Sequence, residues 1–443
     1  MNKTVGILTL GCKVNQYESE AIAEALSAHG FSVCSPNDAC DIYIINTCTV
    51  TAESDRKARQ FIRRVLSRRP SAFVLVTGCM AQTDSQSIQQ IEGVDFICGN
   101  RNKMAIVDAV LRLCQSNQKP ASPIIDVPSL NGAGFEAMSI HRFGRTRAYI
   151  KIEDGCESHC TYCIIPSARG DIRSKPMQAI LDEVRCLTEG GCREVVLTGI
   201  ETASWGRDLG NVSLADLLEE VDRIPGIGRV RLGSLDPTIM RPAFVQRIAK
   251  LSSLAPHFHL SMQSGSDAVL ARMKRKYNRT QALQAIERLR DAIPHAQLTT
   301  DIIVGFPGET EQDFEATMDL ARRANFLMIH VFPYSKRQGT PAAAMADQIS
   351  NAVKKERVAR LSQLASEIRL DILQQKIASD LPTSVLFETF EDGYALGHTP
   401  DFIEVRVASP HSLHAQTHQV RLTAIDEDGI TCLGELIDTK GDE

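Results

Sequence analysis

The segment 148–163 reads Ala-Tyr-Ile-Lys-Ile-Glu-Asp-Gly-Cys-Glu-Ser-His-Cys-Thr-Tyr-Cys, a strand-like run that leads directly into a loop with three cysteines. Cys156, Cys160 and Cys163 have C-x3-C-x2-C spacing, which is more specific than a lone C-x2-C pair. Iron–sulfur cubanes usually take four cysteine ligands, and structural zinc sites take four cysteine or histidine ligands. Three thiolates would leave one iron of a cubane open, so the loop predicts a reactive cluster. The alternatives are a zinc site completed by His159 and chance clustering.

The same run is the first of a series in which strand-like segments alternate with helical patterns. The segments are 148–152, 194–198, 230–233, 257–262, 298–304 and 326–332. Six β/α units are typical of a parallel barrel or part of one, with its chemistry at the carboxyl ends of the strands. The cysteine loop is therefore expected at the barrel mouth. Other polar residues stand at equivalent points, where each could instead be a turn or cap residue: Glu201, Ser234, Asp236, Gln263, Ser264, Asp301 and Ser335.

Residues 1–116 contain a second α/β pattern. Strand-like runs at 5–10, 41–46 and 73–77 are each followed by a helical segment, which predicts a parallel sheet. One cysteine follows each run: Cys12, Cys48 and Cys79. Ligands of open parallel sheets gather beyond the carboxyl ends of strands, so these cysteines are predicted to converge on a second three-thiolate site. The alternative is that small buried cysteines simply pack at strand ends. The remaining cysteines lack this placement and are interpreted as ordinary: Cys34, Cys40, Cys98, Cys114, Cys186, Cys192 and Cys432.

The length of 443 residues, with 43% hydrophobic content, predicts an α/β multidomain protein with more than one core. The segment 117–145 is rich in Pro, Gly and Ser and is predicted to be a linker. Residues 146–378 would form the barrel domain, ending in a helix at about 350–379. The tail 379–443 has short alternating strands and turns at Asp392-Gly393 and Asp428-Gly429, which predict a small all-β barrel.

No apolar run approaches the roughly 18 residues of a membrane span, and the chain opens into a strand rather than a signal peptide. We therefore expect a cytoplasmic protein without a membrane partner, whose cysteines serve metal or redox chemistry. A net charge of -5 argues against nucleic-acid binding by bulk charge. Two basic clusters could be solvated helix faces or RNA contacts: Arg56, Lys57, Arg59, Arg63, Arg64, Arg68 and Arg69, and Arg272, Lys274, Arg275, Lys276 and Arg279.

These motifs together resemble the radical S-adenosylmethionine (SAM) methylthiotransferase family. Tyr162, the aromatic residue before the last loop cysteine, completes the resemblance to the radical SAM signature. The resemblance covers the whole chain: an N-terminal domain with its three cysteines, a partial (β/α)6 radical SAM barrel, and a C-terminal TRAM barrel ending at 434–437. The segments 9–18 and 332–343 are most similar to the branch that acts on N6-threonylcarbamoyladenosine beside the tRNA anticodon.

The resemblance implies two [4Fe-4S] clusters, one on Cys156, Cys160 and Cys163 and one on Cys12, Cys48 and Cys79. SAM would be both methyl donor and source of a 5′-deoxyadenosyl radical, which removes hydrogen from adenine C2 before a methylated sulfur from the second cluster is delivered there. The implied partners are the tRNA anticodon stem-loop, held by the TRAM barrel and the basic helices, and an electron donor such as flavodoxin or ferredoxin; the sulfur donor is unknown. By analogy, the SAM contacts are Tyr162, Gly199, Glu201, Ser234, Gln263 and Asp301.

Two positions depart from the family pattern. Ser167 stands where tyrosine is common, and the segment 201–205 does not map onto it. Three alternatives stay open: methylthiolation of N6-isopentenyladenosine in tRNA, methylthiolation of an aspartate of a ribosomal protein, and a non-enzymatic iron–sulfur or zinc RNA-binding protein. Lys13 and the segment 333–337 favour the threonylcarbamoyladenosine branch over the isopentenyladenosine branch.

Overall fold

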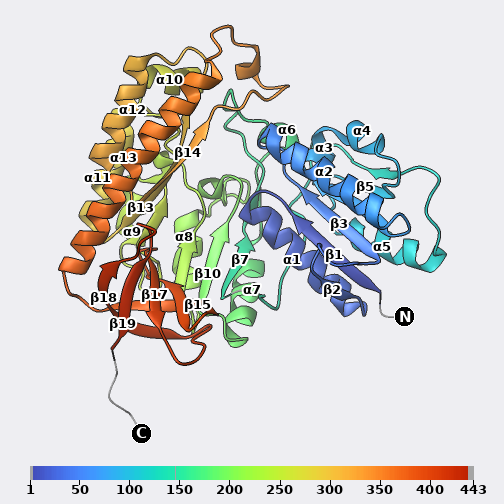
Figure 1. The fold of residues 1–443 in the computed structure, drawn as a ribbon, viewed down its shortest axis with the longest axis horizontal. Coiled ribbons are helices and arrows are strands. Elements are labelled where there is room, and N and C mark those ends of the chain that lie inside the picture. The colour runs from blue at the N-terminus through green and yellow to red at the C-terminus, as the bar shows by residue number, and fades with distance from the viewer. Residues whose placement is uncertain (1–2, 145, 438–443) are drawn as a thin grey trace.

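The computed structural model describes residues 3–144 and 146–437, which form three units (Figure 1). The first unit is a parallel six-stranded sheet of order β2-β1-β3-β4-β5-β6. Every residue of its central strands β3 and β4 is buried, because helices cover both faces. The strands are β1 (Thr4–Thr9), β2 (Ser32–Cys34), β3 (Ile42–Thr47), β4 (Phe73–Gly78), β5 (Phe96–Cys98) and β6 (Ile124–Asp126). The helices are α1 (Lys13–Ala28), α2 (Ala52–Arg68), α3 (Cys79–Thr83), α4 (Ser85–Gln89) and α5 (Ala105–Ser116).

The edge strand β6 corrects the predicted linker 117–145. Ile124–Asp126 pairs in parallel with β5, with Phe96 opposite Ile124. Ile124 and Ile125 are exposed, and a strand of three residues is too short for the alternation of buried and exposed side chains to reveal it. Part of the predicted linker therefore belongs to the first sheet.

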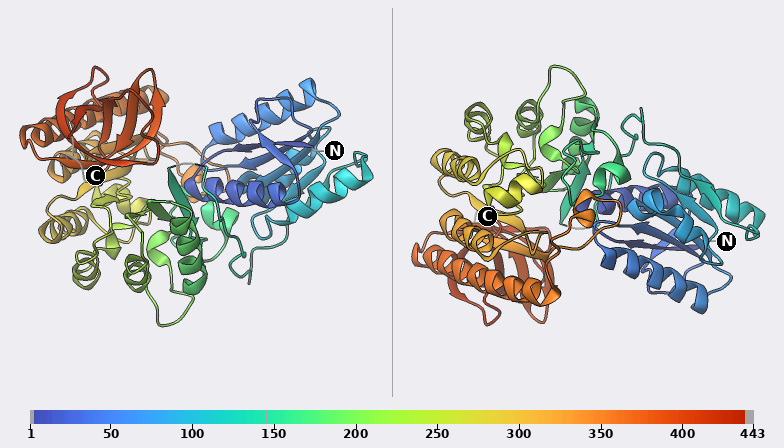
Figure 2. Two further views of the ribbon diagram at one scale, coloured as in Figure 1. Left: turned by 90° about the horizontal axis from the view of Figure 1, so that it is seen from below. Right: turned by 90° about the horizontal axis from the view of Figure 1, so that it is seen from above.

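The second unit is the predicted partial barrel. Its strands form two parallel sheets, β11-β10-β7 and β12-β13-β14, which are joined by bridges between Val230 and Leu254 and between Leu235 and Leu260. The six strands thus follow one another in chain order around the barrel, and the helices lie outside them (Figure 2). The strands are β7 (Arg147–Lys151), β10 (Glu194–Thr198), β11 (Arg229–Leu232), β12 (His257–His259), β13 (Gln297–Val304) and β14 (Met328–Pro333). The helices are α7 (Met177–Glu189), α8 (Leu214–Asp222), α9 (Pro242–Ile248), α10 (Asp267–Arg272), α11 (Arg279–Ala292) and α12 (Glu311–Ala324).

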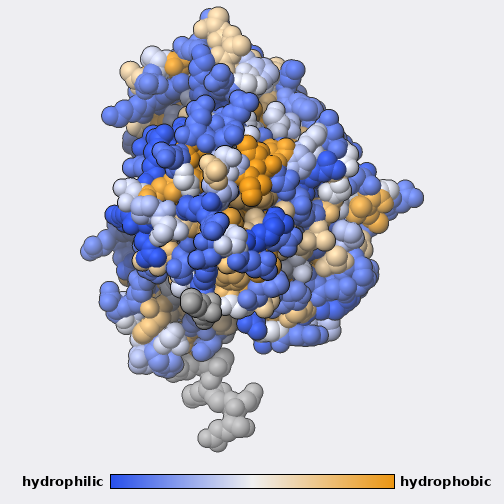
Figure 3. Space-filling model, turned by 90° about the vertical axis from the view of Figure 1, so that its right-hand side faces the viewer, coloured by the Kyte–Doolittle hydropathy of each residue, from blue (hydrophilic) through white to orange (hydrophobic). Residues whose placement is uncertain are grey.

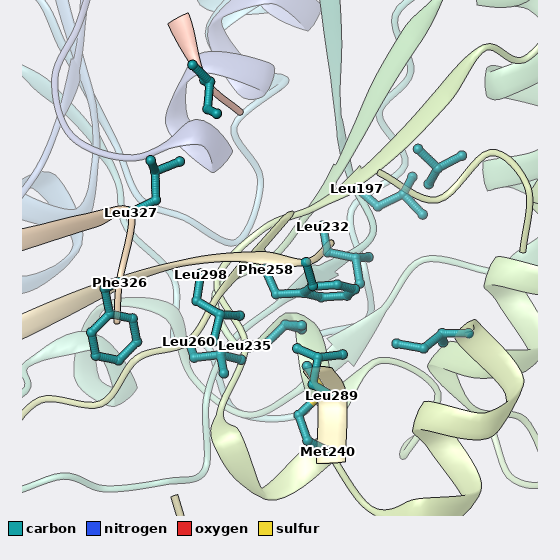
Figure 4. Close-up of a cluster of buried hydrophobic side chains, with 14 of the residues drawn as sticks. Leu197, Leu232, Leu235, Met240, Phe258, Leu260, Leu289, Leu298, Phe326 and Leu327 are labelled. Atoms are coloured by element: carbon teal, nitrogen blue, oxygen red, sulfur yellow. The ribbon is translucent and has the colours of Figure 1, made fainter. Parts of the chain in front are cut away.

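Apolar side chains from successive strands form the core between the barrel and its helices (Figure 4). Leu197, Leu232, Phe258 and Leu298 come from four neighbouring strands and gather near Leu289 of α11; each is at most 2% exposed. Because side chains alternate along a strand, the residues between these apolar positions face the barrel interior. These inward positions include Arg231, His257, His259, Thr299 and Asp301, so the interior contains several polar and charged side chains.

The third unit is a closed barrel of order β15-β16-β17-β19-β18, as predicted for the tail. Asp392 and Gly393 both have positive φ (51° and 80°), the geometry of a tight hairpin turn. The long helix α13 (Asn351–Ala378) leads into this barrel and packs along β14 (Figure 1). The strands are β15 (Thr383–Glu391), β16 (Tyr394–His398), β17 (Glu404–Ala408), β18 (Thr417–Ile425) and β19 (Cys432–Leu436).

Phe402 fixes the small barrel to the amino-terminal end of the larger one. Its ring stacks on His257 at 4.5 Å and on His398 at 4.8 Å between centroids. The guanidinium of Arg231 lies 4.8 Å from its ring centre. Phe402 has φ of 73°, a left-handed backbone that a bulky residue adopts only when its surroundings hold it there. The stack therefore forms a fixed joint between the two barrels.

Replacing Phe402 with alanine is expected to lower the free energy of unfolding by about 2 to 3 kcal/mol, because the half-buried ring contributes less than a fully buried one. Chemical unfolding of both variants measures this. The control is Tyr394→Ala, which removes a 47% exposed ring from the same barrel and should cost under about 1 kcal/mol. Equal losses for the two variants would contradict the role of Phe402.

The face formed by the first unit is mainly hydrophilic, with small apolar areas (Figure 3). Within residues 3–144 and 146–437, none of the helices combines the length and apolar character that a membrane crossing needs.

Candidate functional site

The three-cysteine loop lies at the mouth of the larger barrel. It follows the short strand β8 (Glu153–Asp154), which pairs with β9 (Arg173–Ser174), and it ends at helix α6 (Ile165–Arg169). The loop begins with Gly155 at φ 96°, where a Cβ would lie 1.9 Å from the carbonyl oxygen of Asp171. Only glycine fits such a close approach at positive φ. This turn starts the loop from Cys156 onward.

The first and the middle cysteine of the loop each have a charged partner from the barrel. The Sγ atom of Cys160 accepts a hydrogen bond from Nη1 of Arg275 at 3.4 Å, and Nη2 of Arg275 donates to Asp236 at 2.7 Å. The Sγ atom of Cys156 lies 3.2 Å from a carboxylate oxygen of Glu201. Burial raises the pKa of Cys163 to about 11. Metal binding would deprotonate such thiols outright.

The structure brings Cys12, Cys48 and Cys79 together, as their places after β1, β3 and β4 predicted. A Cβ on Gly11, which has φ of 99°, would lie 2.8 Å from Sγ of Cys48. Burial is the main cause that raises the pKa of Cys48 to about 11, and the neighbouring Cys79 and Cys12 thiols contribute to this rise. Cys48 and Cys79 are buried, whereas Cys12 is exposed. The three thiols therefore lie close together, and Cys12 is the exposed one.

Arg169 connects the group of Cys12, Cys48 and Cys79 with the cysteine loop. Its side chain is fully buried, and Nε donates to Sγ of Cys79 at 3.3 Å. Nη1 donates to Glu18 of α1 at 2.6 Å and to Asp154 at 3.2 Å. Cys79 also acts electrostatically on Cys163, so the two cysteine groups are neighbours.

Glu18 is the anionic centre of this interdomain network. Besides Arg169, it accepts hydrogen bonds from Lys103 and Lys151, and all four side chains are at most 1% exposed. Burial opposes ionisation of Glu18, yet Arg169, Lys103 and Lys151 hold its pKa well below the usual range. Sequence reasoning missed this network. The one sequence signal for Arg169 is its position six residues after Cys163, close to the departure from the family pattern at Ser167.

Most of the predicted SAM contacts surround the barrel mouth. The half-buried Tyr162 packs on an apolar cluster that includes Phe306. A Cβ on Gly199 would lie 2.6 Å from a carboxylate oxygen of Glu153, so the glycine leaves room for that side chain. Ser234 is exposed after β11, and Gln263 has φ of 62°. Glu201 and Asp236 both line a pocket of about 350 Å³ beside the loop.

Two of the polar residues singled out from the sequence lie elsewhere. The carboxylate of Asp301 lies 3.3 Å from Nε2 of His259, and Asp301 is in register with His330 on β14. Ser264 is buried, with its hydroxyl 3.3 Å from that of Thr317. The Ser264 hydroxyl also accepts a hydrogen bond from the Ser266 N–H at 3.2 Å, which is the turn role that was its alternative. Asp301 belongs to a separate group of side chains in the larger barrel.

The donor geometry disfavours a single zinc ion. Tetrahedral zinc holds its sulfur ligands about 3.8 Å apart. In the described part of the chain, only His259, Asp301 and His330 place three ligand atoms within 4.8 Å of one another. Neither cysteine group is that compact, with or without His159. Two sets of three separated sulfur donors fit polynuclear clusters, each with a ligand position left open.

Comparison with known proteins agrees with the fold. Residues 150–321 match the model of the radical SAM superfamily, and residues 4–99 match that of uncharacterized protein family UPF0004. The structure of the radical SAM methyltransferase TsrM from Kitasatospora setae is similar in fold, with a TM-score of 0.56 at 16% identity and 77% coverage of each chain. The protein is thus a radical SAM enzyme.

Relatives define the family more closely. The "threonylcarbamoyladenosine tRNA methylthiotransferase MtaB" of Bacillus subtilis is 38% identical over 91% of this chain and 90% of its own. The Thermotoga maritima protein of the same name is 37% identical over 99% of both chains. The chain belongs to the radical SAM methylthiotransferase family, whose cofactors are SAM and [4Fe-4S] clusters.

Proposed function

We propose that the protein adds a methylthio group to C2 of N6-threonylcarbamoyladenosine beside the tRNA anticodon. The observation that carries this proposal is the pairing of two cysteine groups across Arg169, one at the barrel mouth and one at the end of the first sheet. Two near-full-length relatives whose names specify this substrate support it. One group serves radical generation and the other serves sulfur transfer.

The residues of the site hold and tune the cofactors. Cys156, Cys160 and Cys163 would bind one [4Fe-4S] cluster, and Cys12, Cys48 and Cys79 the other. When bound, these clusters and SAM supply the radical, the sulfur and the methyl group. Arg275 and Arg169 each donate a hydrogen bond to one ligand sulfur, which favours the anionic thiolate. Around the open face of the first cluster, SAM would contact Tyr162, Gly199, Glu201, Ser234 and Gln263.

The anticodon stem-loop is the partner of this site, with phosphate contacts that position the RNA and a splayed base that enters the site. Helix α2 supplies one phosphate-binding face through exposed Lys57, Arg63, Arg64 and Arg68. Arg275 is not among the proposed RNA contacts, because its guanidinium hydrogen-bonds to Cys160 and Asp236. The TRAM barrel would hold the stem, and flavodoxin or ferredoxin would supply electrons. The reaction belongs to the cytoplasm, where tRNA is found.

Deletion of the gene is expected to remove 2-methylthio-N6-threonylcarbamoyladenosine from tRNA and to leave unmethylthiolated N6-threonylcarbamoyladenosine in its place. Mass analysis of digested tRNA measures both nucleosides, and complementation with the wild-type chain is the control. An unchanged level of the methylthio nucleoside in the deletion strain would contradict the proposal.

The same digest tests the closest alternative. A relative from Pelotomaculum thermopropionicum named "tRNA-2-methylthio-N(6)-dimethylallyladenosine synthase" is 35% identical over 85% of both chains. Loss of the methylthio group from that nucleoside alone would assign the present chain to the second substrate. Parallel mass analysis of ribosomal proteins tests modification of an aspartate.

A further inference from the structure

The side of α1 that faces the larger barrel carries a cation that the proposed chemistry leaves without a role. Lys13 is the first residue of α1, directly after Cys12, and its Nζ lies 6.0 Å from the ring centre of Tyr149 on β7. It interacts electrostatically with Arg231 of β11 and with Asp301 of β13. The contact with Tyr149 and the nearby charges of Arg231 and Asp301 place the ammonium group on the side of α1 that faces the larger barrel.

The acidic groups around Lys13 are committed to other partners. Glu194 pairs with Arg231 at 2.8 Å, and Arg229 and Arg147 lie 3.6 Å and 3.9 Å from it. Asp301 pairs with His259. The Lys13 side chain is exposed. Across residues 3–144 and 146–437, it has no hydrogen bond or ion pair with a carboxylate within 4.0 Å.

Two further features beside Lys13 fit a polar, anionic ligand. The first turn of α1 contains no acidic residue, so no carboxylate of that turn competes with an anionic ligand for the positive end of the helix dipole. One turn along the same face, Oε1 of Gln16 is buried without a hydrogen-bond donor. A ligand with a carboxylate and an N–H or O–H group would satisfy both Lys13 and Gln16.

We propose that Lys13 binds the carboxylate of the threonylcarbamoyl group and thereby selects the acidic nucleoside. This inference rests on the proposed function. The dimethylallyl group of the alternative substrate is apolar, and placing it against an unpaired ammonium would leave the cation desolvated without compensation. His259, Asp301 and His330, which converge in the same barrel, offer donors and acceptors for the hydroxyl group of the substrate. The adjacency of Lys13 to Cys12 would hold the base next to the sulfur-carrying cluster.

The test compares two anticodon stem-loop RNAs, one with N6-threonylcarbamoyladenosine and one with its carboxamide, which lacks the negative charge. Initial rates of methylthio product at low RNA concentration give kcat/KM for each RNA with the reconstituted full-length enzyme. The wild type should prefer the acid by about 10- to 100-fold, the range for a hydrogen bond to a charged group. Lys13→Met should reduce this preference to about one, and Lys13→Arg should keep most of it.

The matched control is Lys250→Met at an exposed position after α9, which should keep the wild-type preference. Where Lys13→Met is inactive on both RNAs, the ratio of their dissociation constants replaces the ratio of rates. A wild-type preference retained by Lys13→Met, or no preference in the wild type, would overturn the role of Lys13 while leaving the proposed reaction intact. A wild type that modifies neither RNA would instead refute the proposed function itself.

Discussion

Replacing Cys160 with alanine is expected to abolish release of 5′-deoxyadenosine from SAM. Cys160 is the buried cysteine in the middle of the loop, and its sulfur accepts a hydrogen bond from Arg275. A cubane held by only two loop cysteines should be lost, so the iron content should fall from about eight to about four per chain. Anaerobic reconstitution, iron analysis and chromatography of the SAM products measure these changes.

Two further variants separate the roles of the cysteines. Cys48→Ala should also leave about four irons per chain and remove the methylthio product, but it should still release 5′-deoxyadenosine because the loop cysteines are intact. Cys186→Ala, on the outer helix α7, should keep the wild-type iron content and product. If Cys160→Ala still cleaved SAM, or if zinc replaced iron in the wild type, the radical mechanism would be refuted.

Replacing Arg169 with methionine should lower the free energy of unfolding by about 3 to 5 kcal/mol, the usual cost of breaking a buried ion pair. Methionine nearly preserves the length of the side chain, but Glu18 and Asp154 would lose one of the two cations they share and keep only Lys151 in common. The contact between the first sheet and the barrel should weaken with it. Chemical unfolding measures the stability, and proteolysis within residues 129–144 should become faster.

Arg185→Met is the matched control for this change. Arg185 is 45% exposed and pairs with Asp182 on the surface of α7, so its loss should cost under about 0.5 kcal/mol. Arg169→Lys keeps the charge but cannot reach Cys79, Glu18 and Asp154 at once, and its stability should be intermediate. Wild-type stability of Arg169→Met would show that the network has no stabilising effect.

Sequence reasoning located the cysteines because their signals are local. The spacing of Cys156, Cys160 and Cys163 is contained in eight residues, and the places of Cys12, Cys48 and Cys79 follow from the ends of strongly apolar strands. The central strands and the long helix α13 were predictable for the same reason, since a buried strand or a long helix shows in composition and periodicity.

The charged contacts could not be predicted, because their partners are remote in the sequence. The sequence groups Arg275 with neighbouring cations, yet the side chain contacts Cys160, which is 115 positions away in the sequence. Arg169 and Lys103 reach Glu18 over 151 and 85 positions. No local pattern distinguishes a buried arginine from a solvated one, since tertiary packing alone decides which of them loses its water. The short edge strand β6 was not predicted for a different reason: its apolar residues are exposed, so its three residues show no buried face.

The network around Glu18 has a consequence for biosynthesis. Translation makes Glu18 first, Lys103 next, and Lys151 and Arg169 only after the first sheet is complete. A carboxylate without its cations is costly to bury, and domains generally fold in order as they are synthesised. Lys103 alone is available to pair with Glu18 in the nascent N-terminal domain, so we expect this part of α1 to stay partly solvated until Lys151 and Arg169 have been made. The two cysteine groups come together only at that stage, so their alignment is a late step in the maturation of the enzyme.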